Sequence, residues 1–151
     1  MNAREFFEAA RDCAAQVERA HARLERMRSR LGPRSPGMAP STRGGSADPS
    51  ARLDAWIDAD ACTERLVAEL EQTVADALLV IDGVRLTCGE RAGDILELRY
   101  VDGWAWAAIG EECGLTDDGA RIAAASAERE VDIRGLPSMR ASGLVLRSMR
   151  G

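Results

Sequence analysis

One segment, residues 95–116, constrains the fold of this chain more than any other part. It reads ILELRYVDGWAWAAIGEECGLT, and its apolar residues recur at helical spacing on both sides of a break at Val101-Asp102-Gly103. Gly114 predicts a tight turn, because the residue past a helix end often adopts a left-handed conformation that suits glycine. Thr116 then stands where the N-cap of a further helix is expected. The pattern predicts a helix-turn-helix unit.

We expect the three helices of this unit near residues 90–100, 104–113 and 117–131. The apolar face of the middle helix is expected to consist of Trp104, Ala108 and Ile109. A unit of this kind usually places its third helix in the major groove of DNA. On this expectation the candidate DNA-binding residues are Thr116, Arg121, Ser126, Arg129, Arg134 and Arg140.

Residues 98–110, LRYVDGWAWAAIG, carry a resemblance to a known family. They resemble the pattern of sigma-70 region 4, the promoter-reading domain of bacterial initiation factors, in which LRY is followed by an acid, a glycine, aromatic positions and an isoleucine. The specific match covers about residues 89–132. The layout of residues 1–132 is similar to small phage and prophage proteins that resemble late-operon regulators of the ArpU and RinA type. The resemblance implies a DNA-binding transcriptional regulator.

Two long heptad patterns precede this unit. The first predicts a helix over residues 1–31, with an apolar residue at alternating steps of four and three. Asp48-Pro49 is an N-cap and first-turn proline for a second helix over residues 51–86. Its seam is interrupted by two polar residues, Asp60 and Thr63. The predicted seam residues of this helical hairpin include Phe6, Val17, Leu24, Trp56, Val67, Leu70 and Val74.

The expected fold class is therefore all-α: a long antiparallel, coiled-coil-like hairpin followed by a three-helix helix-turn-helix domain at residues 89–132. The two seams are either closed on each other or shared with another subunit, and we expect a homo-oligomer because two narrow seams bury little surface. Residues 32–50, rich in Pro, Gly and Ser, are expected to be a flexible linker. Asp82-Gly83 and Cys88-Gly89 are expected to bracket a short connection. Residues 133–151, basic and glycine-containing, are expected to be a mobile tail.

Charge is distributed unevenly along the chain. Residues 89–132 hold 4 arginines and 11 acids, net −7, whereas residues 133–151 hold 4 arginines and no acid. A DNA reader usually presents a basic face, since neutralised phosphates supply most non-specific affinity. The predicted third helix instead opens Thr-Asp-Asp-Gly-Ala-Arg, and Ala123–Ala125 stand where the family usually has basic or hydroxyl residues. Arginines also cluster late in the first helix and in the linker, at Arg19, Arg23, Arg26, Arg28, Arg30 and Arg34.

Several classes are not expected from the sequence. No stretch approaches the roughly 20 apolar residues of a membrane span, and the acidic N-terminus is unlike a signal peptide, so we expect a cytoplasmic protein. The four cysteines form no metal-ligand spacing. No nucleophile with its base and no phosphate loop is found, so neither an enzyme nor a cofactor is expected.

The sequence thus favours a phage-type, DNA-binding transcriptional regulator that oligomerises through its hairpin, with double-stranded DNA and RNA polymerase as candidate partners. Two alternatives stay open. The first is a DNA-packaging protein like a small terminase, which also joins a helix-turn-helix to a helical oligomerisation core. The second is a protein-interaction module that grips polymerase or a sigma factor, which the acidic charge of residues 89–132 supports.

Overall fold

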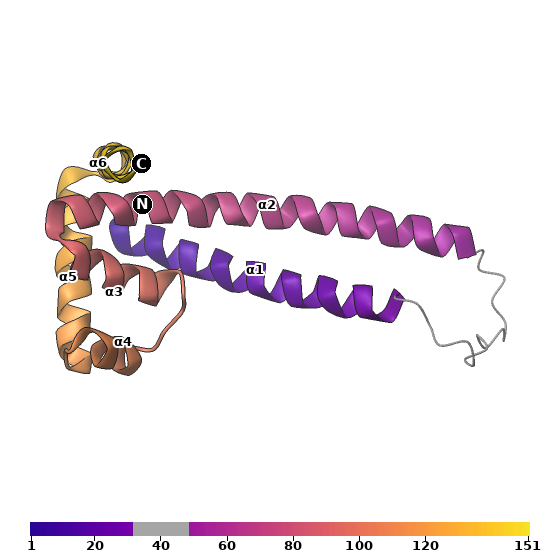
Figure 1. Cartoon of the computed structure of the whole chain (residues 1–151), viewed down its shortest axis with the longest axis horizontal. Coiled ribbons are helices and arrows are strands. Elements are labelled where there is room, and N and C mark those ends of the chain that lie inside the picture. Colours follow the sequence, from indigo (N-terminus) through magenta and orange to yellow (C-terminus); the bar gives the residue numbers. More distant parts are fainter. Residues whose placement is uncertain (32–48) are drawn as a thin grey trace.

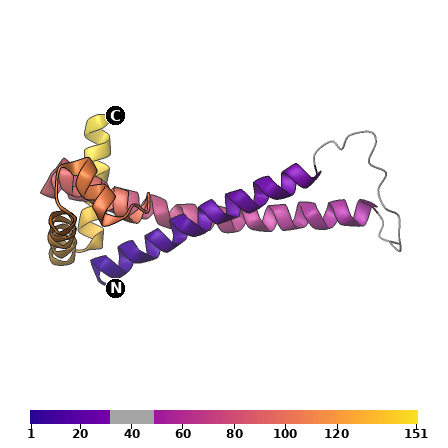
Figure 2. The same cartoon turned by 90° about the horizontal axis from the view of Figure 1, so that it is seen from below.

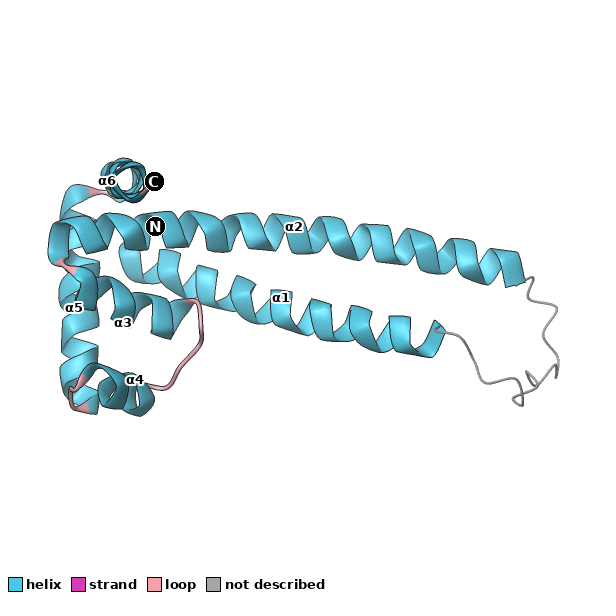
Figure 3. Ribbon diagram, in the orientation of Figure 1, coloured by secondary structure: helices cyan, strands magenta, loops and turns pink. Residues whose placement is uncertain are grey.

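The computed structural model describes residues 1–31 and 49–151, with only the backbone described at residue 31 and at most positions from 49 to 58. The described residues form helices and no strand, so the expected all-α fold class is confirmed (Figure 3). The helices are α1 Ala3–Leu31, α2 Pro49–Cys88, α3 Glu90–Tyr100, α4 Trp106–Cys113, α5 Asp117–Arg134 and α6 Leu136–Arg150. None of them has the length and apolar character that a membrane span requires. The predicted linker lies outside the described residues, apart from the start of α2.

Helices α1 and α2 lie side by side, run in opposite directions and project beyond the other helices (Figures 1 and 2). We call the projecting part, residues 14–30 of α1 and 57–74 of α2, the arm. Leu24 and Val67 are buried in it, with 4% and 5% of their surfaces exposed. The side chain of Trp56 lies outside the described residues. The other predicted seam residues of the arm are half-buried: Val17, Leu70 and Val74.

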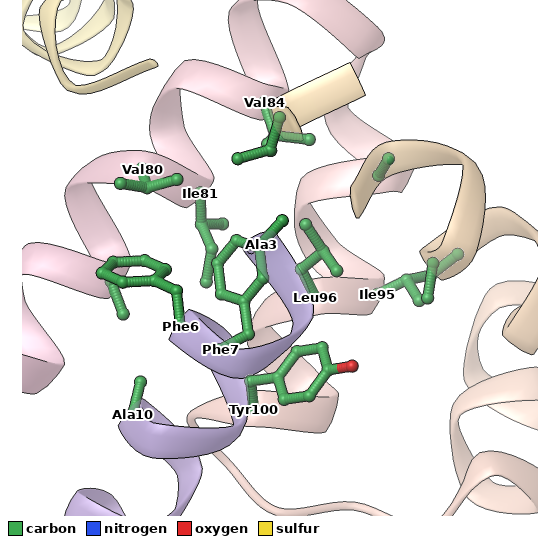
Figure 4. Close-up of a cluster of buried hydrophobic side chains, with 14 of the residues drawn as sticks. Ala3, Phe6, Phe7, Ala10, Val80, Ile81, Val84, Ile95, Leu96 and Tyr100 are labelled. Atoms are coloured by element: carbon green, nitrogen blue, oxygen red, sulfur yellow. The ribbon is translucent and has the colours of Figure 1, made fainter. Parts of the chain in front are cut away.

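A hydrophobic core forms where the first turns of α1 meet the C-terminal part of α2 and helix α3 (Figure 4). Phe7 is fully buried there, and its ring stacks on Tyr100 with centroids 5.3 Å apart. Ile81 and Leu96 are also fully buried. Each such side chain stabilises the fold by about 1.5–3 kcal/mol. This core joins the arm to the helices that follow.

Helix α4 begins two residues later than the sequence predicts. Gly103 has φ +76, and the extended backbone of Ala105 (φ −70, ψ 151) precedes the helix. Trp104 is consequently 38% exposed, and Ala108 is exposed too. The expectation that these two residues line an apolar face is wrong. Only Ile109 of the three is buried: Trp104 lies before the helix begins, and Ala108 is on its exposed side.

The turn between α4 and α5 has a left-handed glycine. Gly114 adopts φ 70 and ψ 31, and the Leu115 amide donates to the Gly110 carbonyl oxygen at 2.7 Å. The Thr116 hydroxyl accepts from the Gly119 amide at 2.9 Å and caps α5. Such a cap contributes about 1 kcal/mol. Capping fixes where α5 starts, and hence which of its residues face outward.

Residues 136–150 form helix α6 instead of a mobile tail, and α6 crosses α2 on the side of α2 that faces away from α1 (Figures 1 and 2). A Cβ atom at Gly83 would lie 2.1 Å from the Met139 carbonyl oxygen, so the two backbones touch. Met139 itself is fully buried. The expected break at Gly83 is therefore also wrong: α2 continues to Cys88, and the chain turns only at Gly89. Glycines that suggested flexibility instead permit close helix packing.

The arginines of α6 bind acids of other helices. Arg140 donates two hydrogen bonds to the Asp76 carboxylate, at 2.7 and 2.8 Å. Arg147 pairs with Asp82 at 2.8 Å. Arg150 pairs with Glu90. These ion pairs lie across α2 and the start of α3, so the charges of α6 hold it in place.

Arg85 links α2 to α3, with 9% of its side chain exposed. Its guanidinium donates to Asp82 at 2.8 Å, to Asp94 at 3.1 Å and to Glu97 at 2.6 Å. A Cβ at Gly93 would come within 2.1 Å of the Arg85 Cγ, so the glycine makes room for this side chain. Burial lowers the pKa of Arg85, but the hydrogen bonds with these carboxylates outweigh burial and raise it above its ordinary value.

Candidate nucleic-acid interface

Helix α5 carries most of the residues that the sequence proposes for DNA contact. Thr116 is engaged as the cap. Arg121 is exposed, and its Nε lies 3.1 Å from Asp117. Ser126 and Arg129 are exposed, and within the described residues Arg129 makes no ion pair. The outward side of α5 therefore offers one unpaired cation.

The other two predicted contacts lie apart from this face. Arg134 ends α5 and pairs with Glu130 at 2.6 Å. Arg140 belongs to α6, where Asp76 holds it against α2. The expected phosphate anchor on a mobile tail is wrong at Arg140, because its charge is already bound.

A basic cluster of three arginines lies beside the first turns of α5. Burial lowers the pKa of Arg99 in α3, and the positive charges of Arg11 in α1 and Arg121 in α5 lower it further. Like charges shift a pKa in this way only at short range. Arg121 lines the same hollow as Trp106, whose ring carries the Arg99 guanidinium, and Arg11 lines a hollow with Val101 just past the end of α3, so all three side chains lie near the C-terminal end of α3. We call Arg11, Arg99 and Arg121 the arginine cluster.

Aromatic and backbone contacts fix Arg99 within this cluster. Its guanidinium carbon lies 4.6 Å from the centre of the Trp106 ring, and one of its nitrogens donates to the Trp104 carbonyl oxygen at 3.0 Å. Among the described residues Arg99 has no carboxylate partner. A planar guanidinium held on an aromatic ring keeps further N–H groups for an anion.

A hollow of about 290 Å³ opens next to Arg121. The Tyr100 hydroxyl donates to Glu128 on its wall. Burial raises the pKa of Glu128 and that of Tyr100. The hollow thus has a basic rim and an acidic inner wall. Its lining residues are Arg4, Tyr100, Trp106, Arg121, Ala124, Ala125 and Glu128.

Sequence reasoning singled out neither Arg11 nor Arg99. Arg99 stands inside the LRY motif, which was a usable signal. Arg11 has no motif, and it reaches the cluster only because Phe7 packs α1 against Tyr100 of α3. That contact joins parts of the chain 93 residues apart, which local patterns do not reveal.

No protein-family model, curated protein or solved structure matches this chain. Across residues 1–31 and 49–151, no group of three or more potential ligands among His, Cys, Asp and Glu is placed to hold a metal ion.

Proposed function

We propose that this chain is a DNA-binding transcriptional regulator of the phage or prophage type, in which α3, α4 and α5 act as a helix-turn-helix resembling sigma-70 region 4. The observation that carries the proposal is Arg99 of the arginine cluster, which stacks on the Trp106 ring beside Arg121 of α5 and has no carboxylate partner among the described residues. Arg99 forms no ion pair among the described residues, and a phosphate group supplies the negative charge that pairs with it.

In this proposal α5 enters the major groove with its outward side. Arg129 is the candidate for a guanine edge, and the exposed Ile122 for the methyl group of thymine. The arginine cluster binds phosphates on the adjoining strand and fixes the position of α5. Asp118 near the helix start repels phosphates, so we expect the approach of α5 to be limited to one orientation.

The acidic surroundings set the strength of binding. Residues 89–132 have a net charge of −7, so long-range attraction to DNA is absent and binding depends on a few local contacts. Three phosphate contacts imply a salt slope of about −2.7, and affinity then falls roughly 40-fold between 50 and 200 mM salt. A conventional basic DNA reader has a steeper slope.

The test is binding of the full-length protein to random duplex DNA at both salt concentrations, measured by fluorescence anisotropy. Arg121→Glu and Arg134→Glu form a matched pair, because each arginine lies on α5, is exposed and pairs with an acid four residues earlier. We expect Arg121→Glu to weaken binding at least tenfold and Arg134→Glu to change it less than threefold. Absence of binding by the wild type at low salt would contradict the proposed DNA-binding function. Equal losses would contradict the role of the first turns of α5.

A second candidate, a protein-interaction module, has its own observation. The outward face of α6 exposes Leu144, Val145 and Met149, at 59%, 50% and 72%. Arg140, Arg147 and Arg150 each pair with an acid of α2 or α3, so the charges of α6 are balanced beside this apolar face. Loss of partner binding on Val145→Glu, in a protein that binds no DNA at low salt, would support this candidate, with RNA polymerase as the first partner to test.

A further inference from the structure

Ion pairs cover one flank of the arm. His21 lies 3.3 Å from Glu71, and Arg28 lies 3.4 Å from Glu64 and 3.7 Å from Asp60. At helical spacing these residues lie on the same side of the seam through Leu24 and Val67. We call this side the closed flank.

The opposite flank of the arm has apolar residues and, among the described residues, no ion pair. Leu66 is 52% exposed, and its neighbours across the seam are half-buried. Helical spacing places four such residues there: Ala20, Met27, Leu66 and Leu70. We call this side the open flank. Apolar side chains in this position are stabilised when another surface removes them from water.

The two helices of the arm have opposite charges. Residues 14–30 of α1 hold 5 arginines and 2 acids, net +3. Residues 57–74 of α2 hold 1 arginine and 5 acids, net −4, and three of these acids, Asp60, Glu64 and Glu71, pair with α1 on the closed flank. Outside the closed flank, α1 carries Arg19, Arg23, Arg26 and Arg30, and α2 carries Glu69, so a partner that fits the arm presents acidic groups to α1 and a basic group to α2. A second copy of the arm has both kinds of group.

We propose that two copies of this chain pack through the open flanks of their arms, with the arms parallel and α1 of each chain on α2 of the partner. The inference goes beyond the proposed function and does not rest on it. In this arrangement the four arm helices form a bundle, and both α3–α5 units lie at the same end.

Symmetry selects the parallel arrangement. A two-fold axis along the arms places α1 on α2 of the other copy, so that basic surface meets acidic surface. A two-fold axis across the arms places α1 on α1 and α2 on α2, which brings like charges together. Like charges at short range are destabilising, so the antiparallel arrangement is disfavoured.

The internal ion pairs also predict one contact between the copies. Because His21 is level with Glu71, and the helices run in opposite directions, Arg23 is level with Glu69. Both residues are exposed, and neither forms an ion pair among the described residues. A two-fold axis along the arms preserves these levels. Arg23 therefore lies against Glu69 of the partner subunit.

Sedimentation velocity of the full chain tests the interface. We expect the wild type to sediment as a dimer and Leu66→Glu to sediment as a monomer. Ile57→Glu is the matched control. Ile57 is 49% exposed, and its helical spacing from Asp60 and Glu64 places it on the closed flank, so we expect this variant to remain dimeric. A monomeric wild type, a larger ring or an equal loss with Ile57→Glu would overturn the proposal. Circular dichroism of both variants verifies that they are folded.

Charge exchange gives a second route that leaves the apolar flank intact. Arg23→Glu and Glu69→Arg should each weaken the dimer at least threefold, and the double variant should recover most of that loss. Failure of the double variant to recover would contradict the predicted pairing.

A distance measurement tests the orientation. A spin label is placed on the exposed Cys88, the last residue of α2, and the other three cysteines are replaced. The measurement then gives the distance between the α2 C-termini of the two copies. Parallel arms keep the labels within about 40 Å, whereas antiparallel arms centred near residue 66 separate them by roughly 60 Å or more, at 1.5 Å of rise per residue. The longer distance would overturn the parallel arrangement.

Discussion

Gly143 of α6 lies against Leu79 of α2 so closely that a Cβ atom on the glycine would be 2.0 Å from the leucine carbonyl oxygen. Replacing glycine by alanine inside a helix ordinarily stabilises it by about 1 kcal/mol. At this crossing the added methyl group must push two backbones apart, so we expect Gly143→Ala to destabilise the protein by about 2–3 kcal/mol. Urea unfolding measures the change. Ser148→Ala, on the exposed side of α6, is the control and should lie within about 0.5 kcal/mol of wild type.

Arg85 should have a larger effect on stability than other arginines of α2. Arg85→Met removes the common partner of Asp82, Asp94 and Glu97, and leaves their charges close together. We expect a loss of about 2–3 kcal/mol, because these carboxylates are partly exposed and water screens some of the repulsion. Arg65→Met, at an exposed position of the same helix, should change the free energy of unfolding little. Similar losses in both variants would show that Arg85 has no linking role.

Glu128 should make stability depend on pH. Burial raises the pKa of this carboxyl in the folded state, so the folded protein holds the proton more tightly than the unfolded chain. Its stabilising contribution is present below the unfolded pKa, near 4.5, and is lost as pH rises through the raised folded value. Glu128→Gln, which cannot ionise, should therefore gain stability relative to wild type as pH rises from 4 to 7. A constant difference across this range would contradict the expected burial effect.

Arg11 should contribute one phosphate contact. Under the proposed function, Arg11→Gln should weaken binding to all DNA sequences alike and reduce the salt slope by about 1. Arg65→Gln, on the arm, should leave the slope unchanged. A change of sequence preference in Arg11→Gln would instead indicate that this residue reads bases.

The parts of the fold that could be predicted are those that local periodicity determines. The 3.6-residue pattern of apolar side chains predicts helices, and the all-α class follows from it. Helix α6 was missed because its contact surface is partly a bare backbone at Gly143, which no apolar pattern marks. The start of α4 was missed because Trp104 is apolar in composition but lies in an extended segment.

The candidate site could be predicted from the sequence only in part, for a similar reason. The residues of α5 follow from the motif around Gly114 and Thr116. The arginine cluster joins α1 with α3 and α5, which lie far from α1 in the sequence, and the Phe7 ring that packs on Tyr100 holds α1 against α3. A sequence reports which side chains are present, but long-range packing decides which of them become neighbours.

Helix α2 is one uninterrupted rod of 40 residues, which spans about 60 Å from the arm to the junction with α3. A rod transmits torsion as well as position. A slip of one residue along the α1–α2 seam would rotate α2 by about 100° and carry the bare backbone of Gly83 away from α6. The same rotation would swing Arg85 out of its place over Gly93. The register of α1 against α2 in the arm and the packing of α3 and α6 on α2 therefore change together.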